Sequence, residues 1–204
     1  MLKAPKFWYQ SNFSILAILL LPLSLIWITG TYLKKKFAKP IRSKIPVIAI
    51  GSAIIGGSGK TPSVIYVCEI LEKIGYKPHV ISRGYGGSAN EVIKVSPDMS
   101  YSVVGDEAIM MSKYYPTWVS KNKYNAFAMA EKDGANILVL DDALQSYNIF
   151  KNLNIYVYDS IQSFGNKLII PSGPLRESIS SVLNRSQIVF LVNTDNCPEI
   201  SKNK

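Results

Sequence analysis

The sequence predicts an α/β protein with a P-loop NTPase-like, mainly parallel sheet, helices on both faces, and an N-terminal membrane helix in front. Short apolar runs typical of buried strands alternate with runs of helical spacing, which favours a doubly wound parallel sheet. A glycine-rich stretch, "GSAIIGGSGKTP" at residues 51–62, directly follows the first apolar run. Near the amino terminus lies a long uncharged segment. We therefore expect an anchor and basic segment over residues 1–44 and a nucleotide-binding lobe over 45–204.

The amino-terminal segment has the length and flanks of a membrane anchor. Residues 7–33 hold 27 consecutive uncharged residues, enough to cross a bilayer or to lie deeply in it. Residues 34–44 carry six positive charges, which favours the cytoplasmic side and contact with anionic lipid. A buried core helix stays open because Pro22 interrupts the run, whereas a signal peptide fits poorly without a cleavage pattern. Aromatic residues typical of an interface flank the run at Trp8, Tyr9, Trp27 and Tyr32.

Composition limits the remaining classes of protein. The 204 residues are 48% hydrophobic, which is enough for one core and an appendage. The net charge of +9 owes much to the basic block after the apolar run, so we expect no nucleic-acid partner. Two cysteines, Cys68 and Cys197, form no disulfide framework and favour a reducing compartment. The oligomeric state stays open.

The first strand and its glycine loop form a candidate nucleotide site. The strand "KIPVIAIGS" covers residues 44–52 and is almost entirely apolar. Three glycines then leave backbone N–H groups accessible to phosphate oxygens, and a lysine and a threonine start the next helix. The strict P-loop pattern requires a glycine at position 54, where this chain has isoleucine, so a turn without a ligand remains the alternative. The candidate nucleotide-binding residues are Ile54, Ile55, Gly56, Gly57, Ser58, Gly59, Lys60 and Thr61.

The later elements follow in alternation. Apolar residues at helical spacing (Val64, Val67, Cys68, Leu71 and Ile74) predict a helix over 61–75, which Gly75 ends. The remaining strands are expected within 77–87, 116–120, 136–142, 154–159 and 187–193, and the remaining helices within 105–115 and 123–134. In such a sheet, ligands bind at the carboxyl ends of the strands.

The strand "ILVLDD", residues 137–142, has the form of a Walker B strand. A carboxylate at its exposed end, Asp141, can hold Mg²⁺ opposite Thr61. The alternative is a capping or turn role, because aspartate is common where strands end.

Five ordered motifs together resemble the tetraacyldisaccharide 4'-kinase (lipid A 4'-kinase) family. They are "PKFW…LLLPLSLIW" at the amino terminus, "VISRGYGG" (80–87), "VGDEA" (104–108), "LDDALQ" (140–145) and "IPSGPLRES" (170–178). The resemblance implies ATP-dependent phosphorylation of the 4'-hydroxyl of a tetraacyldisaccharide 1-phosphate precursor of lipid A, with ATP and Mg²⁺ as cofactors. It further implies the cytoplasmic face of a Gram-negative inner membrane, with the disaccharide and membrane lipids as partners.

The resemblance also implies roles for single residues. Asp106 matches the proposed catalytic base, although "GDE" is equally good chemistry for a helix start. Lys60 matches the lysine that meets the β- and γ-phosphates, and Asp141 and Asp142 complete the implied catalytic set. Thr61, Glu107 and Asp141 match positions around the metal. Gln145, Arg83 and Arg176 match polar and basic positions near the nucleotide.

The chain departs from the family pattern at several motif positions. The substituted positions are Ser52, Ile54, Asn122, Lys123, Ala143 and Ser146. The family continues into a second, carboxyl-terminal lobe with a histidine partner for the catalytic aspartate, whereas His79 here is expected to be structural. We therefore expect the amino-terminal lobe of such a kinase, truncated, fragmentary or decaying, and weakly active. The alternatives are a membrane-tethered nucleotide-binding protein without kinase activity and a P-loop ATPase that organises partners.

Overall fold

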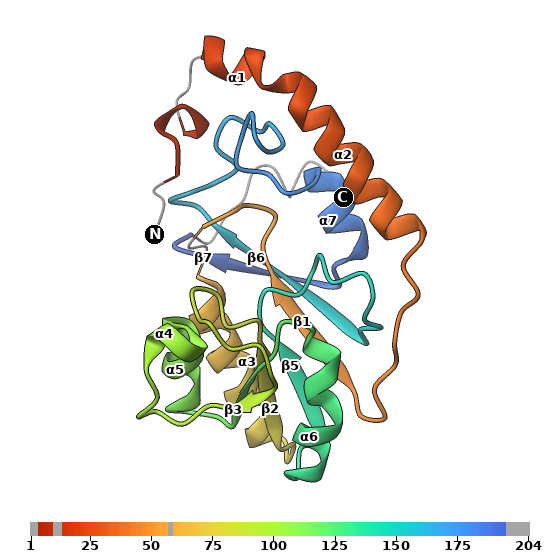
Figure 1. The fold of residues 1–204 in the computed structure, drawn as a ribbon, viewed down its shortest axis with the longest axis vertical. Coiled ribbons are helices and arrows are strands. Elements are labelled where there is room, and N and C mark those ends of the chain that lie inside the picture. Colours follow the sequence, from red (N-terminus) through yellow and green to blue (C-terminus); the bar gives the residue numbers. More distant parts are fainter. Residues whose placement is uncertain (1–3, 10–13, 57–58, 195–204) are drawn as a thin grey trace. The chain divides into compact units, whose positions relative to one another are not determined.

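The computed structural model describes residues 4–9, 14–56 and 59–194. The chain forms two compact units whose segments alternate along the sequence (Figure 1). Unit 1 comprises 1–38, 52–59 and 156–204, and unit 2 comprises 39–51 and 60–155. The domain boundary predicted between residues 44 and 45 divides the chain differently and stays a prediction.

Unit 2 contains a mainly parallel sheet, as the alternating pattern predicts. Its strands lie in the order β3-β4-β2-β5-β1, and only the short edge strand β3 pairs antiparallel, with β4. The central strands are buried along their whole length, which explains why their sequences are continuous apolar runs. The bounds are β1 (Val47–Gly51), β2 (Pro78–Ser82), β3 (Ile93–Lys94), β4 (Thr117–Val119) and β5 (Ile137–Leu140).

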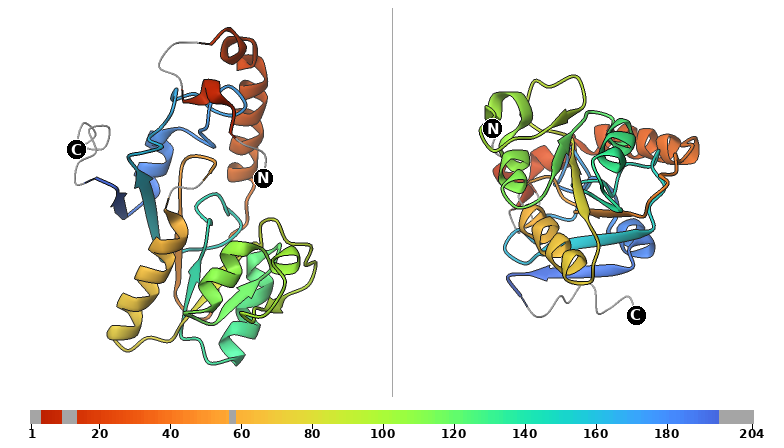
Figure 2. Two further views of the ribbon diagram at one scale, coloured as in Figure 1. Left: turned by 90° about the vertical axis from the view of Figure 1, so that its left-hand side faces the viewer. Right: turned by 90° about the horizontal axis from the view of Figure 1, so that it is seen from below.

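Helices cover both faces of this sheet. Figure 2 shows α3 on one side of the strands and α6 on the other. The helix α3 starts at Lys60 and ends before Gly75, which has a φ of +90°. Ile74, which the spacing placed on the buried face, is 65% exposed because it lies beyond the last helical turn. The bounds are α3 (Lys60–Lys73), α4 (Tyr101–Val104), α5 (Asp106–Ser112), η2 (Lys123–Ala126) and α6 (Phe127–Lys132).

Four residues of α3 face the core as their spacing predicts: Val64, Val67, Cys68 and Leu71 are buried. Burial, together with the nearby Glu72, raises the pKa of the Cys68 thiol to about 12. A thiol in such surroundings behaves as a small apolar group.

Unit 1 holds the amino-terminal helices and the last strands. The strand β6 begins in unit 2 and ends in unit 1, where it is the neighbour of β7. Ser178 caps α7 by accepting a hydrogen bond from Ser181 N at 3.3 Å. The bounds are η1 (Lys6–Trp8), α1 (Ile15–Leu19), α2 (Leu21–Lys36), β6 (Leu153–Asp159), α7 (Ile179–Arg185) and β7 (Ile188–Val192).

The predicted N-terminal membrane helix is not supported. Within the described ranges, no helix combines the length and the apolar character needed to cross a membrane. The uncharged segment instead contains η1, α1 and α2, with residues 10–13 outside the description. Pro22 lacks the N–H that would bond to Ile18 O, and α1 stops at Leu19, so the run is not one continuous helix.

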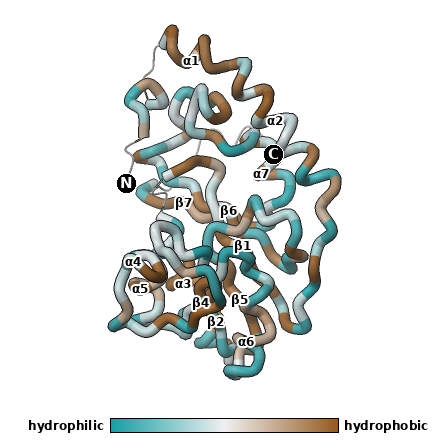
Figure 3. Tube along the Cα trace, in the orientation of Figure 1, coloured by the Kyte–Doolittle hydropathy of each residue, from teal (hydrophilic) through white to brown (hydrophobic). Residues whose placement is uncertain are grey.

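Polar side chains attach these amino-terminal elements to the loop of residues 168–176. Ser24, the buried residue of α2, donates to Ile169 O at 2.8 Å and lies 2.9 Å from Ser172 Oγ. Trp27 Nε1 donates to Arg176 O at 3.0 Å, and Trp8 Nε1 donates to Pro171 O at 3.0 Å. Most apolar side chains of α1 and α2 are exposed, and the tube in Figure 3 is mostly brown along α1 and alternates between brown and pale along α2.

Candidate functional site

The candidate site lies in unit 2, where parallel strands end beside the start of α3. Asp141 follows β5 directly, and Ser82 is the last residue of β2, its neighbour in the sheet. Lys60 and Thr61, the first residues of α3, are each only 8% exposed. Since parallel strands present their carboxyl ends at one edge, Ser82 and Asp141 lie together there, and Lys60 is within electrostatic reach of Asp141.

Asp141 is the most deeply buried ionisable group of this cluster, at 2% exposure. Its Oδ2 accepts a hydrogen bond from Ser82 Oγ at 3.0 Å, while Oδ1 has no hydrogen-bond partner among the described residues. Burial raises the pKa of the Asp141 carboxyl, and the charges of Lys123 and Lys60 oppose that rise. An orphaned oxygen on a buried carboxylate fits a role as a ligand for a cation or a water.

Asp142 follows in a left-handed conformation with a φ of 46°, which aspartate tolerates better than most residues. Its carbonyl oxygen accepts a hydrogen bond from Lys123 Nζ at 3.4 Å. Lys123 is 6% exposed and starts η2. Sequence reasoning treated Lys123 only as a departure from the family pattern and missed that it lies within the electrostatic reach of Asp141. No local pattern signalled this, because η2 reaches the site through the fold of the sheet.

Asp106 and Glu107 occupy the first turn of α5. Asp106 is exposed, and its Oδ1 accepts a hydrogen bond from Glu107 N at 3.0 Å. Glu107 is half-buried, and burial followed by the charge of Asp141 raises the pKa of its carboxyl, against the opposing charge of Lys60. The "GDE" motif thus supplies the helix start expected of it and also belongs to the same electrostatic cluster as Lys60 and Asp141.

The "SRGYGG" and "VGDEA" motifs pack directly on each other. A Cβ on Gly105 would lie 2.5 Å from Tyr85 O, and a Cβ on Gly87 would lie 2.4 Å from Val103 O. Only glycine allows these backbones to approach so closely. The contact fixes the start of α5, and with it Asp106 and Glu107, against the loop that follows β2.

Other predicted residues flank the cluster or lie outside it. Arg83 follows β2 and is exposed, and Gln145 is half-buried in the turn after β5. Arg176 belongs to unit 1, as do Ile54, Ile55 and Gly56. Within that unit, Arg176 N donates to Ala53 O at 2.8 Å, and Ile55 N donates to Pro174 O at 3.0 Å. Gly57 and Ser58 lie outside the described residues.

Two glycines of the loop have a backbone conformation with positive φ. Gly56 has a φ of 123° and Gly59 a φ of 69°, both in the region that side chains disfavour. Ile54, in place of the expected first glycine, is buried and forms an isolated antiparallel bridge with Leu175. The strict pattern therefore fails at a position where the backbone is extended and paired, which isoleucine suits.

Few side chains of the site are suited to bind a metal ion. Nowhere in the described ranges do three or more His, Cys, Asp or Glu side chains gather closely enough to hold a metal ion. Mg²⁺ in nucleotide sites commonly needs only one or two carboxylates, with phosphates and water completing its coordination. The orphaned Oδ1 of Asp141 fits that smaller requirement, and Thr61 as a second ligand stays a prediction.

His79 lies at the other end of β2 from Ser82. Its Nδ1 accepts a hydrogen bond from Trp118 Nε1 at 3.2 Å, and burial lowers its pKa. These contacts are those of a buried structural histidine.

The sequence matches a known family of proteins and several of its members. A family model described as tetraacyldisaccharide-1-P 4'-kinase matches residues 16–204. A tetraacyldisaccharide 4'-kinase of Rhodospirillum centenum is 36% identical over 198 residues, which cover 95% of this chain and 59% of the relative. The enzyme of that name from Rhodospirillum rubrum is 38% identical over 197 residues, covering 95% and 58%.

A solved structure has the same fold. It is the "apo" form of LpxK from Aquifex aeolicus in complex with ATP, which superposes with a TM-score of 0.79 at 25% sequence identity. The match covers 90% of this chain and 61% of that chain. The present chain thus spans about three fifths of the length of these relatives.

Proposed function

Because this chain belongs to the tetraacyldisaccharide-1-P 4'-kinase family, we propose that it transfers the γ-phosphoryl group of ATP to the 4'-hydroxyl of a tetraacyldisaccharide 1-phosphate precursor of lipid A. One observation carries the proposal: Lys60 and Thr61 start a helix in the same electrostatic cluster as the buried carboxylate of Asp141. A lysine, a hydroxyl and a carboxylate are the groups that phosphoryl transfer needs around a nucleotide. ATP as the phosphoryl donor is supported by the ATP complex of the Aquifex aeolicus relative.

In this proposal, each cluster residue has a part in holding the nucleotide. Lys60 binds the β- and γ-phosphates, and Thr61 and Asp141 are ligands for Mg²⁺, with Glu107 and Asp142 as further acidic groups around it. Mg²⁺ neutralises charge on the phosphates when bound. Lys123 supports Asp142 through its carbonyl oxygen and offsets part of the negative charge. Gln145 and Arg83 contact the nucleotide from outside the cluster, and the role of Arg176, which belongs to unit 1, stays a prediction.

Asp106 is the general base of the proposed reaction. It is exposed at the start of α5, so a sugar hydroxyl can reach its carboxylate and transfer a proton to it. Gly105 and the packed glycine loop hold the start of that helix in place. A positioned base contributes about 10²–10⁴-fold to a rate, so the alignment of the two substrates and the neutralisation of phosphate charge contribute more to the acceleration than the base does.

Membrane lipid is the second partner in the proposal. Support comes from the apolar side chains of α1 and α2 that are exposed, among them Ile15, Leu19 and Ile26 at 69–78%. Lys34, Lys35 and Lys36 end α2 and suit an anionic surface. We propose that the protein acts at the cytoplasmic face of the inner membrane, with these helices in contact with the interface.

Transfer of labelled phosphate tests the proposal. With [γ-³²P]ATP, Mg²⁺ and tetraacyldisaccharide 1-phosphate, the protein should form a product labelled at the 4' position. Asp106→Asn should lower kcat by about 10²–10⁴-fold. Asp98→Asn, which changes an exposed aspartate in the turn after β3, is the matched control and should leave kcat unchanged. ATP binding without any transfer would contradict the kinase and favour a nucleotide-binding protein without kinase activity.

A further inference from the structure

The turn that carries the acidic residues after β5 is held by a lysine from further along the chain. We call residues 141–145 the acidic turn. Lys151 Nζ donates to Ala143 O at 3.1 Å and to Leu144 O at 3.3 Å. An ammonium group has three donors and can bind neighbouring carbonyl oxygens at once. Because hydrogen bonds from a charged donor are stronger than those between neutral groups, Lys151 fixes the backbone in the middle of the acidic turn.

The backbone of Lys151 is itself fixed on both sides. Phe150 N donates to Ile41 O at 2.9 Å, and Asn152 N donates to Val47 O at 2.8 Å. The side chain of Asn152 adds a second bond, because its Oδ1 accepts from Val47 N at 2.9 Å. Val47 is the first residue of β1. The side chain of Lys151 therefore links a segment that is anchored to β1 with the acidic turn at the end of β5.

The acidic turn has a backbone conformation that needs such support. Asp142 has a φ of 46°, in the left-handed region, and a residue with a side chain keeps this conformation only where its surroundings hold it there. Lys123 Nζ binds Asp142 O, and Lys151 binds the next two carbonyl oxygens. Three consecutive carbonyl oxygens thus accept hydrogen bonds from two ammonium groups. They belong to the same short segment as Asp141 and Gln145.

The position of this backbone matters for a metal ion because Asp141 is the proposed ligand. Its Oδ1 is buried and has no hydrogen-bond partner among the described residues, so no other contact of that oxygen orients it. Mg²⁺ demands near-ideal octahedral geometry, with oxygen ligands at about 2.0–2.1 Å. A small displacement of the acidic turn therefore weakens the bond from Asp141 to the ion. Lys151 acts on that bond through the carbonyl oxygens of Ala143 and Leu144.

We propose that Lys151 is a positioning residue for Mg²⁺ in the nucleotide site, because its ammonium group holds the acidic turn in the geometry in which Asp141 binds the ion. The inference rests on the proposed function, since it takes Mg·ATP to be the ligand of this cluster. Loss of a group that orients a metal ligand typically lowers metal affinity about 10–100-fold. Loss of the positive charge alone would act in the opposite direction and strengthen the binding of a cation. Weaker Mg²⁺ binding without Lys151 therefore reports its positioning role.

Two calorimetric titrations measure what the protein contributes to Mg²⁺ binding. The Kd for ATP is determined in EDTA and in saturating Mg²⁺. By linkage, the ratio of the first Kd to the second is the factor by which protein-bound ATP holds Mg²⁺ more tightly than free ATP does. Lys151→Met removes the donors, and Lys151→Arg keeps a charged donor.

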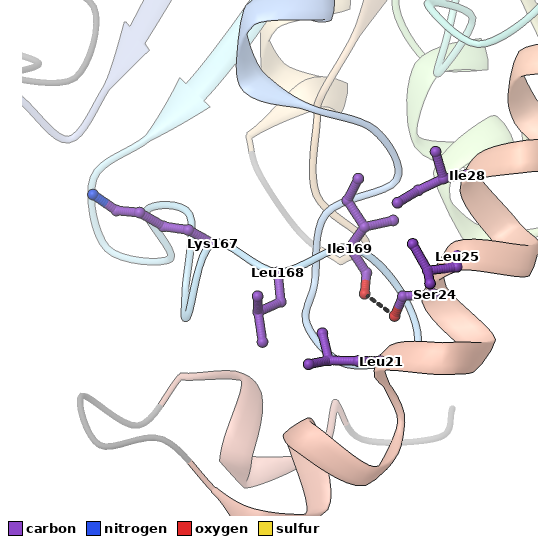
Figure 4. Close-up of a pocket in the computed structure, with 7 residues that line it drawn as sticks. All are labelled: Leu21, Ser24, Leu25, Ile28, Lys167, Leu168 and Ile169. Atoms are coloured by element: carbon purple, nitrogen blue, oxygen red, sulfur yellow. Dashed lines mark hydrogen bonds between the residues drawn. The ribbon is translucent and has the colours of Figure 1, made fainter.

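Lys132→Met and Lys167→Met are the matched controls, one in each compact unit, and both change an exposed lysine. Figure 4 shows the side chain of Lys167 pointing away from the apolar residues beside it. We expect Lys151→Met to lower the ratio of the two Kd values about 10-fold or more, and Lys151→Arg and both controls to keep the ratio of wild type. If Lys151→Met does not fold, Lys151→Gln takes its place, because its neutral amide is a shorter and weaker donor, and the ratio should again fall.

Two results would overturn the inference and leave the kinase intact. An unchanged ratio in Lys151→Met, whatever its melting temperature, would mean that the lysine only stabilises the fold. A higher ratio would mean that its charge outweighs its effect on position. Failure of wild type to bind ATP in either titration would instead refute the proposed function, and the role of Lys151 with it.

Discussion

The hydrogen bond from Ser82 Oγ to Asp141 Oδ2 supports the whole cluster, and Ser82→Ala removes it. In this variant Asp141 Oδ2 loses its partner, and Oδ1 already has none. Asp141, which is only 2% exposed, is then left with two unpaired carboxylate oxygens. Hydrogen bonds to charged groups contribute about 1.5–3 kcal/mol, so we expect a loss of about 2 kcal/mol in the free energy of unfolding. Gly84 N lies 3.5 Å from the same hydroxyl, too far to add much. For a chain of this size, the expected change in Tm is about 4–8 °C.

The sign of the pH dependence makes this prediction specific. Ser82 lowers the pKa of Asp141, whose pKa burial raises above 3.8, because the hydroxyl stabilises the charged carboxylate. The difference in stability between wild type and Ser82→Ala should therefore be largest at high pH, where Asp141 is ionised. It should shrink as pH falls through the raised pKa of Asp141.

Thermal and chemical unfolding across about pH 4–8, without nucleotide, is the assay. Ser120→Ala is the control, because Ser120 is equally buried but donates to a neutral acceptor, Asn122 O, at 2.8 Å. It should cost about 1 kcal/mol at every pH. If Ser82→Ala shows the same small, pH-independent loss as Ser120→Ala, the charged hydrogen bond to Asp141 is not what stabilises this edge of the sheet.

Two further predictions concern β2 and the loop that follows it. Gly84→Ala should destabilise the protein by about 2 kcal/mol or more, because a Cβ there would meet Val119 Cγ1 at 2.4 Å with a φ of +70°. Gly86→Ala, at a similar φ of +81° but in open space, should cost only about 1 kcal/mol, and equal losses in unfolding titrations would refute the packing argument. In an NMR titration, His79 should show a pKa below 6.5, since burial disfavours its charged form. Stability should then decline as pH falls below about 6.5, and a His79 pKa above that value would contradict the buried contact with Trp118.

Much of unit 2 could be predicted from local pattern. Continuous apolar runs predicted β1, β2 and β5. Strands that are buried on both faces have apolar residues at successive positions, without the alternation of polar and apolar residues seen in half-exposed strands. Glycine, lysine and threonine at residues 59–61 predicted a helix start, which the structure has at Lys60, and the nucleotide-binding role of the loop before it stays a prediction. The short β3 and the four-residue α4 were missed, since neither is long enough to have a period.

The unpredicted features depend on contacts between distant segments. Lys123 reaches the cluster only because η2 follows β4 to the same edge of the sheet, and its own neighbours in sequence give no sign of it. The amino-terminal run was read as one long helix, because hydropathy does not register how Pro22 affects backbone hydrogen bonding. The attachment of α2 through Ser24 likewise follows from Ile169 and Ser172, almost 150 residues away in the chain.

Mg·ATP binding to wild type and Lys60→Ala, measured by isothermal titration calorimetry, tests the central claim most directly. Lys73→Ala is the matched control, because Lys73 lies on the same helix but is exposed and paired with Glu69. Loss of a charge-assisted contact to phosphate should weaken binding about 10–100-fold in Lys60→Ala, whereas Lys73→Ala should bind as wild type does. Equal affinity in all three proteins would contradict a nucleotide site at Lys60. The glycine loop would then be only a turn, and the cluster around Asp141 would not bind the phosphates of ATP.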